Sequence, residues 1–190
     1  FLWLVLTGCT QEKKEFTVLQ WNIWQEGTMV PGGYEAIVDE IIRLRPDFVT
    51  LSEVRNYNNT NFTARLTRSL KEKGETYYSF YTYDTGLLSR YPITDSLTVF
   101  PENGDHGSIY RLTTDMNGKK MAVYTSHLDY LDDAYYNVRG YDGSTWEEIP
   151  IPTTVEEVLE RNVASQRDDA IKMFIEQAKN CLLYTSPSPR

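Results

Sequence analysis

The sequence predicts an α+β fold, a four-layer α/β/β/α sandwich in which two mainly antiparallel sheets stack face to face and helices flank them. Three observations predict it. Strand and helix patterns alternate at the start, a series of β patterns with short turns follows, and a long amphipathic helical pattern comes last. Stacked sheets bury one face against each other and leave the other for helices. With 190 residues and no internal repeat or interdomain linker, the chain forms one domain or most of one.

Two strand and helix pairs open the domain. Residues 16–24 carry apolar side chains at nearly every other position and predict a strand, which ends in a loop rich in Gly and Pro. Residues 34–46 place apolar side chains at helical spacing, and the proline at their end marks the stop. Residues 47–54 predict a second, more fully buried strand. Residues 61–74 repeat the helical pattern, with Gly74 at the C-cap.

The middle of the domain predicts a meander of antiparallel strands. Residues 76–128 contain several β patterns separated by short turns, and Asn117-Gly118 is a typical hairpin dipeptide. An irregular stretch rich in aromatic residues comes next. Residues 154–180 then predict one long amphipathic helix, with Thr153 or Thr154 as its N-cap.

The charge balance limits the classes of partner. The chain has 27 acidic and 19 basic side chains, which give a net charge of −8. This charge disfavours tight, sequence-independent binding to nucleic acid and other polyanions. A nuclease would need a local basic patch or a bound metal ion.

The first nine residues resemble the end of a bacterial lipoprotein signal peptide. Their apolar run is too short to span a bilayer, and Leu6, Thr7, Gly8 and Cys9 are similar to the lipobox, in which Cys9 would become the lipidated first residue. Residues 10–15 would form a polar linker. A diacyl anchor at Cys9 would hold the protein on a membrane in the extracytoplasmic bacterial cell envelope. The alternative is an ordinary N-terminal strand.

The last ten residues, 181–190, depart from the pattern of the domain. Their Ser-Pro-Ser-Pro end favours an extended, unpacked tail. This segment is either a true terminus or foreign sequence joined at a truncated reading frame. The domain itself is predicted over residues 16–180.

Three polar residues fall at predicted strand ends. Asn22 lies near the end of the first strand, Glu53 ends the second, and His127 ends a later one. A carboxylate suits a hard cation such as Mg²⁺ or Ca²⁺, an amide can orient it, and an imidazole can donate to developing negative charge. Each residue alone has a simpler reading as a turn cap, a solvated charge or a capped strand end. Together they indicate a metal-assisted hydrolytic site.

Four motifs in order resemble the endonuclease/exonuclease/phosphatase family, whose fold is DNase-I-like. "LQWNIW" is similar to its first motif, in which Asn22 would be the metal-site asparagine, and "RPDFVTLSEV" to its second, in which Glu53 would bind Mg²⁺. "YDTGLLSRYPI" is similar to a middle element, and we expect its Ser89 and Arg90 to be structural. "VYTSHLDY" is similar to the motif whose histidine, here His127, contacts the scissile phosphate.

Two later motifs of that family do not occur in the sequence. They are a Gly-Asp-x-Asn strand end and a Ser-Asp-His, which supply the aspartate that orients the attacking water and a second histidine. The resemblance therefore implies a fragment truncated at both ends. As written, this fragment would be catalytically impaired and would expose a sheet edge.

The resemblance implies Mg²⁺-dependent phosphoester hydrolysis, with Mn²⁺ or Ca²⁺ as alternative ions. Glu53 would hold the metal, Asn22 would position Glu53 or the metal, and His127 would bond to the phosphoryl oxygens. We expect Asp129 to tune His127 by a further contact.

The aromatic stretch after His127 is the candidate substrate-binding segment. Arg139 with Tyr141 and Trp146 would form a phosphate clamp with stacking surfaces, and the alternative is a folded loop that covers the sheet. The acidic balance favours a small-molecule or lipid phosphoester over nucleic acid. The sequence does not indicate an oligomeric state.

Two rival functions remain open. The first is a non-catalytic module that keeps the sandwich and binds an anion or another ligand at its rim. The second is a glycosidase with Glu53 and Asp129 as its carboxylate pair, which would leave Asn22 and His127 unexplained.

Overall fold

The computed structural model describes residues 15–182 except residues 105, 117 and 132. In chain order its elements are β1 (Val18–Asn22), α1 (Gly33–Leu44), β2 (Phe48–Val54), the 3-10 helix η1 (Tyr57–Asn59), α2 (Phe62–Glu72), β3 (Tyr78–Ser79), β4 (Asp84–Ser89), β5 (Ile93–Phe100), β6 (Gly107–Met116), β7 (Lys119–Leu128), α3 (Ala134–Asn137), α4 (Val155–Ala164) and α5 (Arg167–Leu182).

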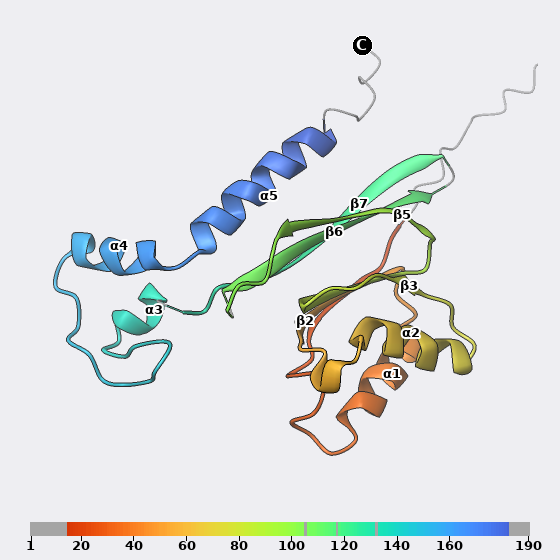
Figure 1. Ribbon diagram of the computed structural model, residues 1–190, viewed down its shortest axis with the longest axis horizontal. Helices are drawn as coiled ribbons and strands as arrows, with labels where there is room; N and C mark the ends of the chain where they lie inside the picture. The colour runs from red at the N-terminus through yellow and green to blue at the C-terminus, as the bar shows by residue number, and fades with distance from the viewer. Residues whose placement is uncertain (1–14, 105, 117, 132, 183–190) are drawn as a thin grey trace, which may run out of the picture.

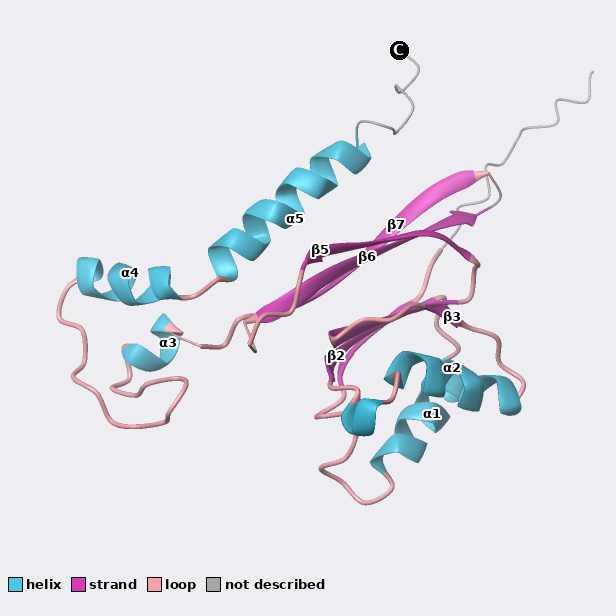
Figure 2. Ribbon diagram, in the orientation of Figure 1, coloured by secondary structure: helices cyan, strands magenta, loops and turns pink. Residues whose placement is uncertain are grey.

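The elements form four stacked layers. Figure 1 shows α1 and α2 on the outside of one sheet, a second sheet stacked on the first, and α5 on the far side of the second sheet. Figure 2 gives the same view by type of secondary structure, with α3 and α4 beyond one end of the sheets. The predicted α/β/β/α sandwich is confirmed.

Both sheets are mainly antiparallel, as predicted. The first has the order β1-β2-β4-β3, and only β1 and β2 run parallel. The second has the order β5-β6-β7 and is antiparallel throughout. Strands β1 and β7 lie at sheet edges, and within the described part of the chain no strand pairs with their outer sides.

Three apolar cores fill the spaces between the four layers. Leu66 is fully buried between the two N-terminal helices and the first sheet. Phe48 and Leu87 lie between the two sheets. Phe174 of α5 packs edge-on against Tyr124 of the second sheet, with the ring centroids 5.1 Å apart. Each layer is therefore held by side chains that the sequence pattern places on one face of its strand or helix.

Several element boundaries agree with the sequence. Gly74 follows α2 with a φ of 89°, and its amide bonds to a carbonyl of the last turn (3.0 Å). Gly118 has a φ of 82° in the turn between β6 and β7. Its partner in the hairpin dipeptide, Asn117, lies outside the described residues. Thr154 is the N-cap of α4 and accepts an amide of the first turn (3.2 Å).

The prediction of one long helix over residues 154–180 is wrong. The segment forms α4 and α5, which are separated at Ser165, where ψ is 142°. The Ser165 hydroxyl accepts the Arg167 amide (3.2 Å), and the Asp129 carboxylate accepts the Gln166 amide (2.9 Å). Because these side chains satisfy amides at the start of a new helix, the backbone can leave the first one.

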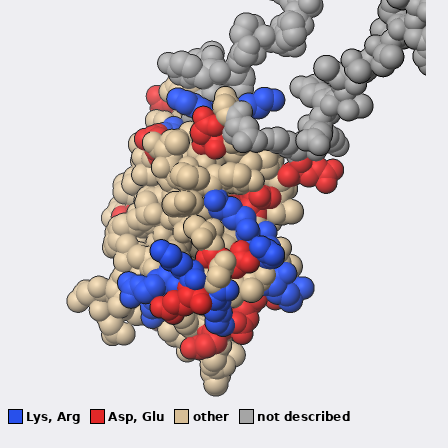
Figure 3. Space-filling view, turned by 90° about the vertical axis from the view of Figure 1, so that its right-hand side faces the viewer, with Lys and Arg blue, Asp and Glu red and all other residues tan. Residues whose placement is uncertain are grey.

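A polar network holds the end of the sandwich that lies opposite α3. Arg90 donates to the Glu75 carboxylate (2.5 Å) and to the Pro46 carbonyl (3.2 Å), and Ser89 accepts the Tyr91 amide (2.9 Å). The structural role expected for Ser89 and Arg90 is therefore confirmed. Figure 3 faces this end and shows basic and acidic side chains intermixed over it.

Candidate active site

Four polar side chains meet at one end of the sandwich. Because β1 and β2 run parallel, their carboxyl ends bring Asn22 and Glu53 to the same edge of the first sheet. Strand β4 starts at this end with Asp84, and β7 of the second sheet ends there with His127. The three strand-end residues singled out in the sequence are thus brought together, with Asp84 added.

Glu53 occupies a β-bulge at the end of β2. The pairing of β2 with β4 shifts between Ser52 and Val54, and Glu53 has a φ of 68°, in the left-handed region. A residue with a side chain adopts this conformation only where its surroundings hold it. The bulge takes the side chain out of the alternation of the strand. Its Oε1 accepts from the Asn22 amide group (2.7 Å), and its Oε2 accepts from the Gln25 backbone amide (2.8 Å).

Asn22 orients Glu53. Its Oδ1 accepts the Trp24 backbone amide (2.9 Å), so its Nδ2 is the group that faces Glu53. The sequence left open whether Asn22 binds the metal or positions its carboxylate ligand. These two hydrogen bonds support the positioning role.

His127 and Asp84 form a hydrogen-bonded pair. The His127 Nδ1 lies 2.9 and 3.1 Å from the two Asp84 carboxylate oxygens, and the Asp84 side chain is only 3% exposed. The hydrogen bond to Asp84 raises the pKa of His127, with the charges of Asp84 and Glu53 adding to it, while burial and Arg55 oppose it. Nδ1 is engaged by Asp84, so Nε2 is the ring nitrogen that can face a ligand.

Arg55 is a site residue that the sequence did not indicate. Its Nη1 lies 3.5 Å from the Asp84 Oδ1, and its side chain is 17% exposed. The guanidinium therefore lies beside the histidine and carboxylate pair and lowers the pKa of His127. The sequence did hold one signal: Arg55 lies two residues after Glu53, and residues two apart in a regular β-strand point to the same face. The bulge at Glu53 interrupts this alternation, so the spacing alone does not place the Arg55 side chain.

The side chains at this end fit a hard divalent cation. Glu53 offers two carboxylate oxygens, each of which accepts one hydrogen bond and has a lone pair left. Mg²⁺ is typically held by one or two carboxylates together with waters and substrate phosphate oxygens. In the described part of the chain, no three His, Cys, Asp or Glu side chains cluster as a ready-made metal centre. Glu53 is thus the candidate protein ligand for the metal ion, and Asn22 holds its carboxylate by a hydrogen bond.

The expected contact between Asp129 and His127 is wrong. The buried Asp129 carboxylate bonds to His106 Nδ1 (2.7 Å) and to the amides of Leu131 (2.8 Å) and Gln166 (2.9 Å). It therefore joins the end of β7 to the start of β6 and to the start of α5. Position 129 lies two residues beyond His127, but the carboxylate that meets His127 comes from β4.

The aromatic segment after β7 folds into its own small cluster. The Arg139 guanidinium lies 3.6 Å from the Tyr135 ring centroid, and the Trp146 ring packs edge-on against Tyr136, with centroids 4.9 Å apart. Tyr141 forms an isolated β-bridge within the segment.

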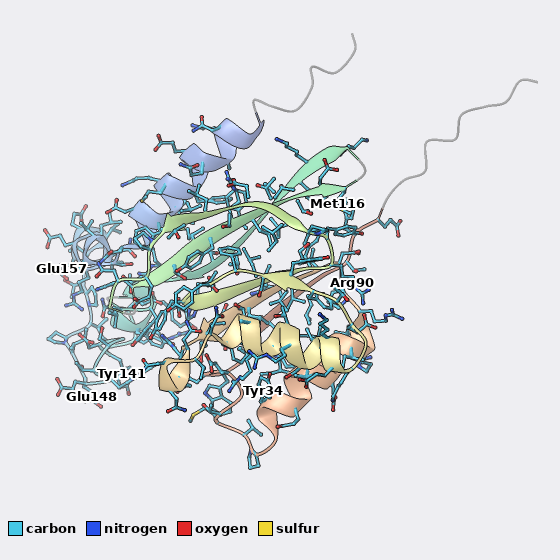
Figure 4. The ribbon with its side chains drawn as sticks, turned by 45° about the vertical axis from the view of Figure 1, so that its right-hand side comes forward. Tyr34, Arg90, Met116, Tyr141, Glu148 and Glu157 are labelled. Carbon is cyan, nitrogen blue, oxygen red and sulfur yellow. The ribbon has the colours of Figure 1, made fainter. Side chains whose placement is uncertain are left out.

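This cluster lies at the site end of the molecule. Figure 4 shows Tyr141 and Glu148 on the side of α3, with Arg90 and Met116 at the other end of the sheets. Tyr141 and Trp146 are exposed, at 43% and 61%. The ring contacts of Arg139 and Trp146 and the backbone hydrogen bonds of Arg139, Tyr141 and Trp146 join residues of this segment to one another.

Cys9, the predicted lipidation site, lies outside the described residues. Among the helices that the structure does describe, none combines the length and apolar character needed to cross a membrane.

Comparisons with known proteins give a match to a family by sequence and partial matches to solved structures, of which two are described below. Residues 19–183 match the Endonuclease/Exonuclease/phosphatase family. A comparison with curated protein sequences gives no match.

One similar structure is TDP2 from D. rerio, humanized by 14 mutations, with 18% identity, a TM-score of 0.47, and coverage of 65% of this chain and 52% of that one. Another is ANGEL2, a 2′,3′-cyclic phosphatase in complex with adenosine-2′,3′-vanadate, with 17% identity, a TM-score of 0.44, and coverage of 62% and 42%. The chain thus spans about half the length of these two structures. The family assignment rests on the sequence match, which covers most of the 190 residues: the chain belongs to the endonuclease/exonuclease/phosphatase family.

Proposed function

We propose that the protein is a Mg²⁺-dependent phosphoester hydrolase. Members of its family are phosphoester hydrolases and generally use divalent metal ions. The observation that carries the proposal is the pairing of a carboxylate, Glu53, fixed in a bulge by Asn22 and Gln25, with a His127–Asp84 pair at the same end of the sandwich.

In this proposal the chain supplies the metal-binding and anion-binding parts of the site. Glu53 would hold the ion, which when bound supplies Lewis-acid stabilisation of phosphoryl charge. His127 would donate from Nε2 to a phosphoryl oxygen while Asp84 holds Nδ1. Arg55 would add positive charge beside the pair.

The function is tested by phosphodiester hydrolysis with Mg²⁺ and with a chelator. The assay is run on the 190-residue chain and on the product of the source gene read past the codon for Asn180. Metal-dependent turnover by either protein supports the proposal. If the gene continues into Gly-Asp-x-Asn and Ser-Asp-His motifs yet its product hydrolyses no phosphoester, the proposal fails. If the reading frame of the source gene ends at Arg190 and the protein binds the phosphodiester without hydrolysing it, a non-catalytic ligand-binding module is the better description of its function.

We further propose a small-molecule or lipid phosphoester as substrate. The net charge of −8 is unfavourable for a polyanion. Arg139, Tyr141 and Trp146 offer a guanidinium and exposed rings on one segment, whose Tyr141 lies at the site end in Figure 4.

We predict that Trp146→Ala raises the KM for an aromatic phosphodiester by about threefold to tenfold, since one ring contact is lost, and leaves kcat within about twofold. The matched control is Tyr78→Ala, which removes a 40% exposed ring from β3. Steady-state kinetics measure both variants. An unchanged KM in Trp146→Ala would remove this segment from substrate binding.

We also propose that Cys9 carries a lipid anchor that holds the protein in the bacterial cell envelope. Support comes from the sequence of Leu6, Thr7, Gly8 and Cys9. Expression of the source gene with Cys9→Ala should move the protein from the membrane fraction to the soluble fraction and abolish labelling by a fatty acid. Membrane association that survives this substitution contradicts the anchor.

A further inference from the structure

The loop after β1 makes one turn of left-handed backbone. Trp24, Gln25 and Glu26 have φ values of 43°, 56° and 62°, and Gly27 has 75°. The Gly27 amide closes the turn on the Ile23 carbonyl (2.7 Å). Left-handed backbone is unfavourable for a residue with a side chain, so three such residues in succession need contacts that hold them.

Glu26 supplies such contacts from a buried position. Its side chain is about 1% exposed, and its Oε1 accepts the backbone amides of Arg55 (2.9 Å) and Asn56 (2.6 Å). Its Oε2 lies 3.5 Å from the Arg65 guanidinium. Burial raises the pKa of Glu26, although the two amides and the charge of Arg65 act in the opposite direction. One carboxylate oxygen of Glu26 thus binds the backbone of residues 55 and 56, while the other faces Arg65.

That segment begins directly after the candidate metal ligand. The amides that Glu26 binds are two and three residues beyond Glu53, whose own left-handed backbone needs support. On the other side of the same turn, the Gln25 amide donates to the Glu53 Oε2 (2.8 Å), and Tyr57 donates to the Gln25 Oε1 (2.6 Å). The turn therefore contacts the Glu53 side chain and also the backbone that follows it.

We infer that Glu26 is a positioning residue for the metal-binding carboxylate of Glu53. By fixing the amides of Arg55 and Asn56, it keeps the bulge in register and sets the direction of the Glu53 side chain and the Arg55 guanidinium. The inference rests on the proposed function of Glu53 as the metal ligand.

A purely structural role for Glu26 makes a different prediction. If Glu26 serves only the fold, its removal lowers the free energy of unfolding of the whole domain. Metal affinity then stays unchanged at temperatures where the protein is folded. A positioning role changes the metal affinity and loosens the hydrogen bond between Gln25 and Glu53 before the fold is lost.

The test compares Glu26→Gln with the parent 190-residue chain, with Mn²⁺ alone as the probe. The substitution removes the charge that strengthens both backbone hydrogen bonds and points an amide group at Arg65. We expect Mn²⁺ binding, measured by water proton relaxation, to weaken about tenfold, as is typical when a group behind a metal ligand is lost. We also expect hydrogen exchange at the Gln25 amide to become about tenfold faster.

Further variants keep the test decisive. Glu75→Gln makes the same chemical change in a carboxylate that pairs with Arg90 at the opposite end, and it should lower the unfolding temperature but leave Mn²⁺ affinity within about twofold. Tyr57→Phe removes only the hydroxyl on Gln25 and should weaken Mn²⁺ binding about threefold. If Glu26→Gln does not fold, the same two measurements are made on Glu26→Asp, which keeps the charge on a shorter side chain, and parental Mn²⁺ affinity with parental exchange at Gln25 in that variant overturns the positioning role.

The outcomes separate this inference from the proposed function. A folded Glu26→Gln protein with parental Mn²⁺ affinity and parental exchange at Gln25 overturns the positioning role. A parent chain that binds no Mn²⁺ contradicts Glu53 as a metal ligand. In that case, exchange at Gln25 still shows whether Glu26 holds Glu53 in place.

Discussion

Glu53→Gln is expected to abolish metal-dependent hydrolysis, with a loss of at least about a thousandfold, or about 4 kcal/mol of transition-state stabilisation. The substitution keeps the size of the side chain and can keep one hydrogen bond, with either Asn22 or the Gln25 amide. It removes the negative charge that a hard cation requires. Because Glu53 is half-buried at a sheet end and not in an apolar core, the fold should remain.

The experiment has a binding arm and an activity arm. Mn²⁺ affinity is measured on the 190-residue chain. Hydrolysis is measured on that chain or on the longer product of the source gene, depending on which of them hydrolyses the phosphodiester. Glu75→Gln is the matched control, since it makes the same change at the far end of the sandwich. Parental Mn²⁺ affinity, or retained metal-dependent turnover, in Glu53→Gln would contradict the metal assignment.

The layers of the fold could be predicted because each layer has a local pattern. Alternating apolar residues predict the strands, helical spacing predicts α1 and α2, and glycines such as Gly74 and Gly118 mark the ends where left-handed backbone is needed. These signals depend on neighbours in the sequence. They therefore survive when the rest of the structure is unknown.

The break between α4 and α5 could not be predicted in this way. The apolar residues of residues 154–180 keep one helical pattern through Ser165, so the local signal favours continuity. The acceptor that frees the Gln166 amide from the helix is Asp129, which lies 37 residues earlier. A long-range hydrogen bond overrides the local preference.

The residues of the candidate site also divide into those that a local sequence pattern indicates and those that only the folded structure brings to the site. Asn22, Glu53 and His127 could be found because polar residues at strand ends stand out against an apolar pattern. Asp84 could not be found, because its role depends on the β-bulge between β2 and β4. Glu26 could not be found, because its role depends on a left-handed turn, and a sequence with Glu at this position does not indicate one.

Asp84→Asn is expected to lower the pKa of His127. Asp84 is the main cause of the raised pKa, and Asn keeps the shape, tolerates the left-handed φ of 63° and carries no charge. A larger fraction of His127 would then be neutral at any pH near its pKa, and the neutral ring is a weaker donor to phosphoryl oxygens. Hydrolysis above the lowered pKa should fall about tenfold to a hundredfold, and the loss should become smaller as the pH is lowered.

The stability of the protein gives an independent check with a defined sign. A histidine whose pKa is higher in the folded protein than in the unfolded chain stabilises the folded state. This contribution is complete below the pKa of the unfolded chain, near 6.5, and is lost as the pH rises through the pKa of the folded protein. The difference in unfolding free energy between parent and Asp84→Asn should therefore be larger at pH 6 than at pH 9. Denaturant unfolding at the two pH values measures this difference.

NMR titration of the histidine resonances measures the cause directly. The chain has only two histidines, and His106, which bonds to Asp129, reports whether that part of the fold is retained. Asp47→Asn, at the opposite end of the sandwich, makes the same chemical change in another hydrogen-bonded aspartate and should leave the His127 titration in place. If His127 titrates alike in the parent and in Asp84→Asn, Asp84 does not control its charge, and the proposed donor role of His127 loses its electrostatic basis.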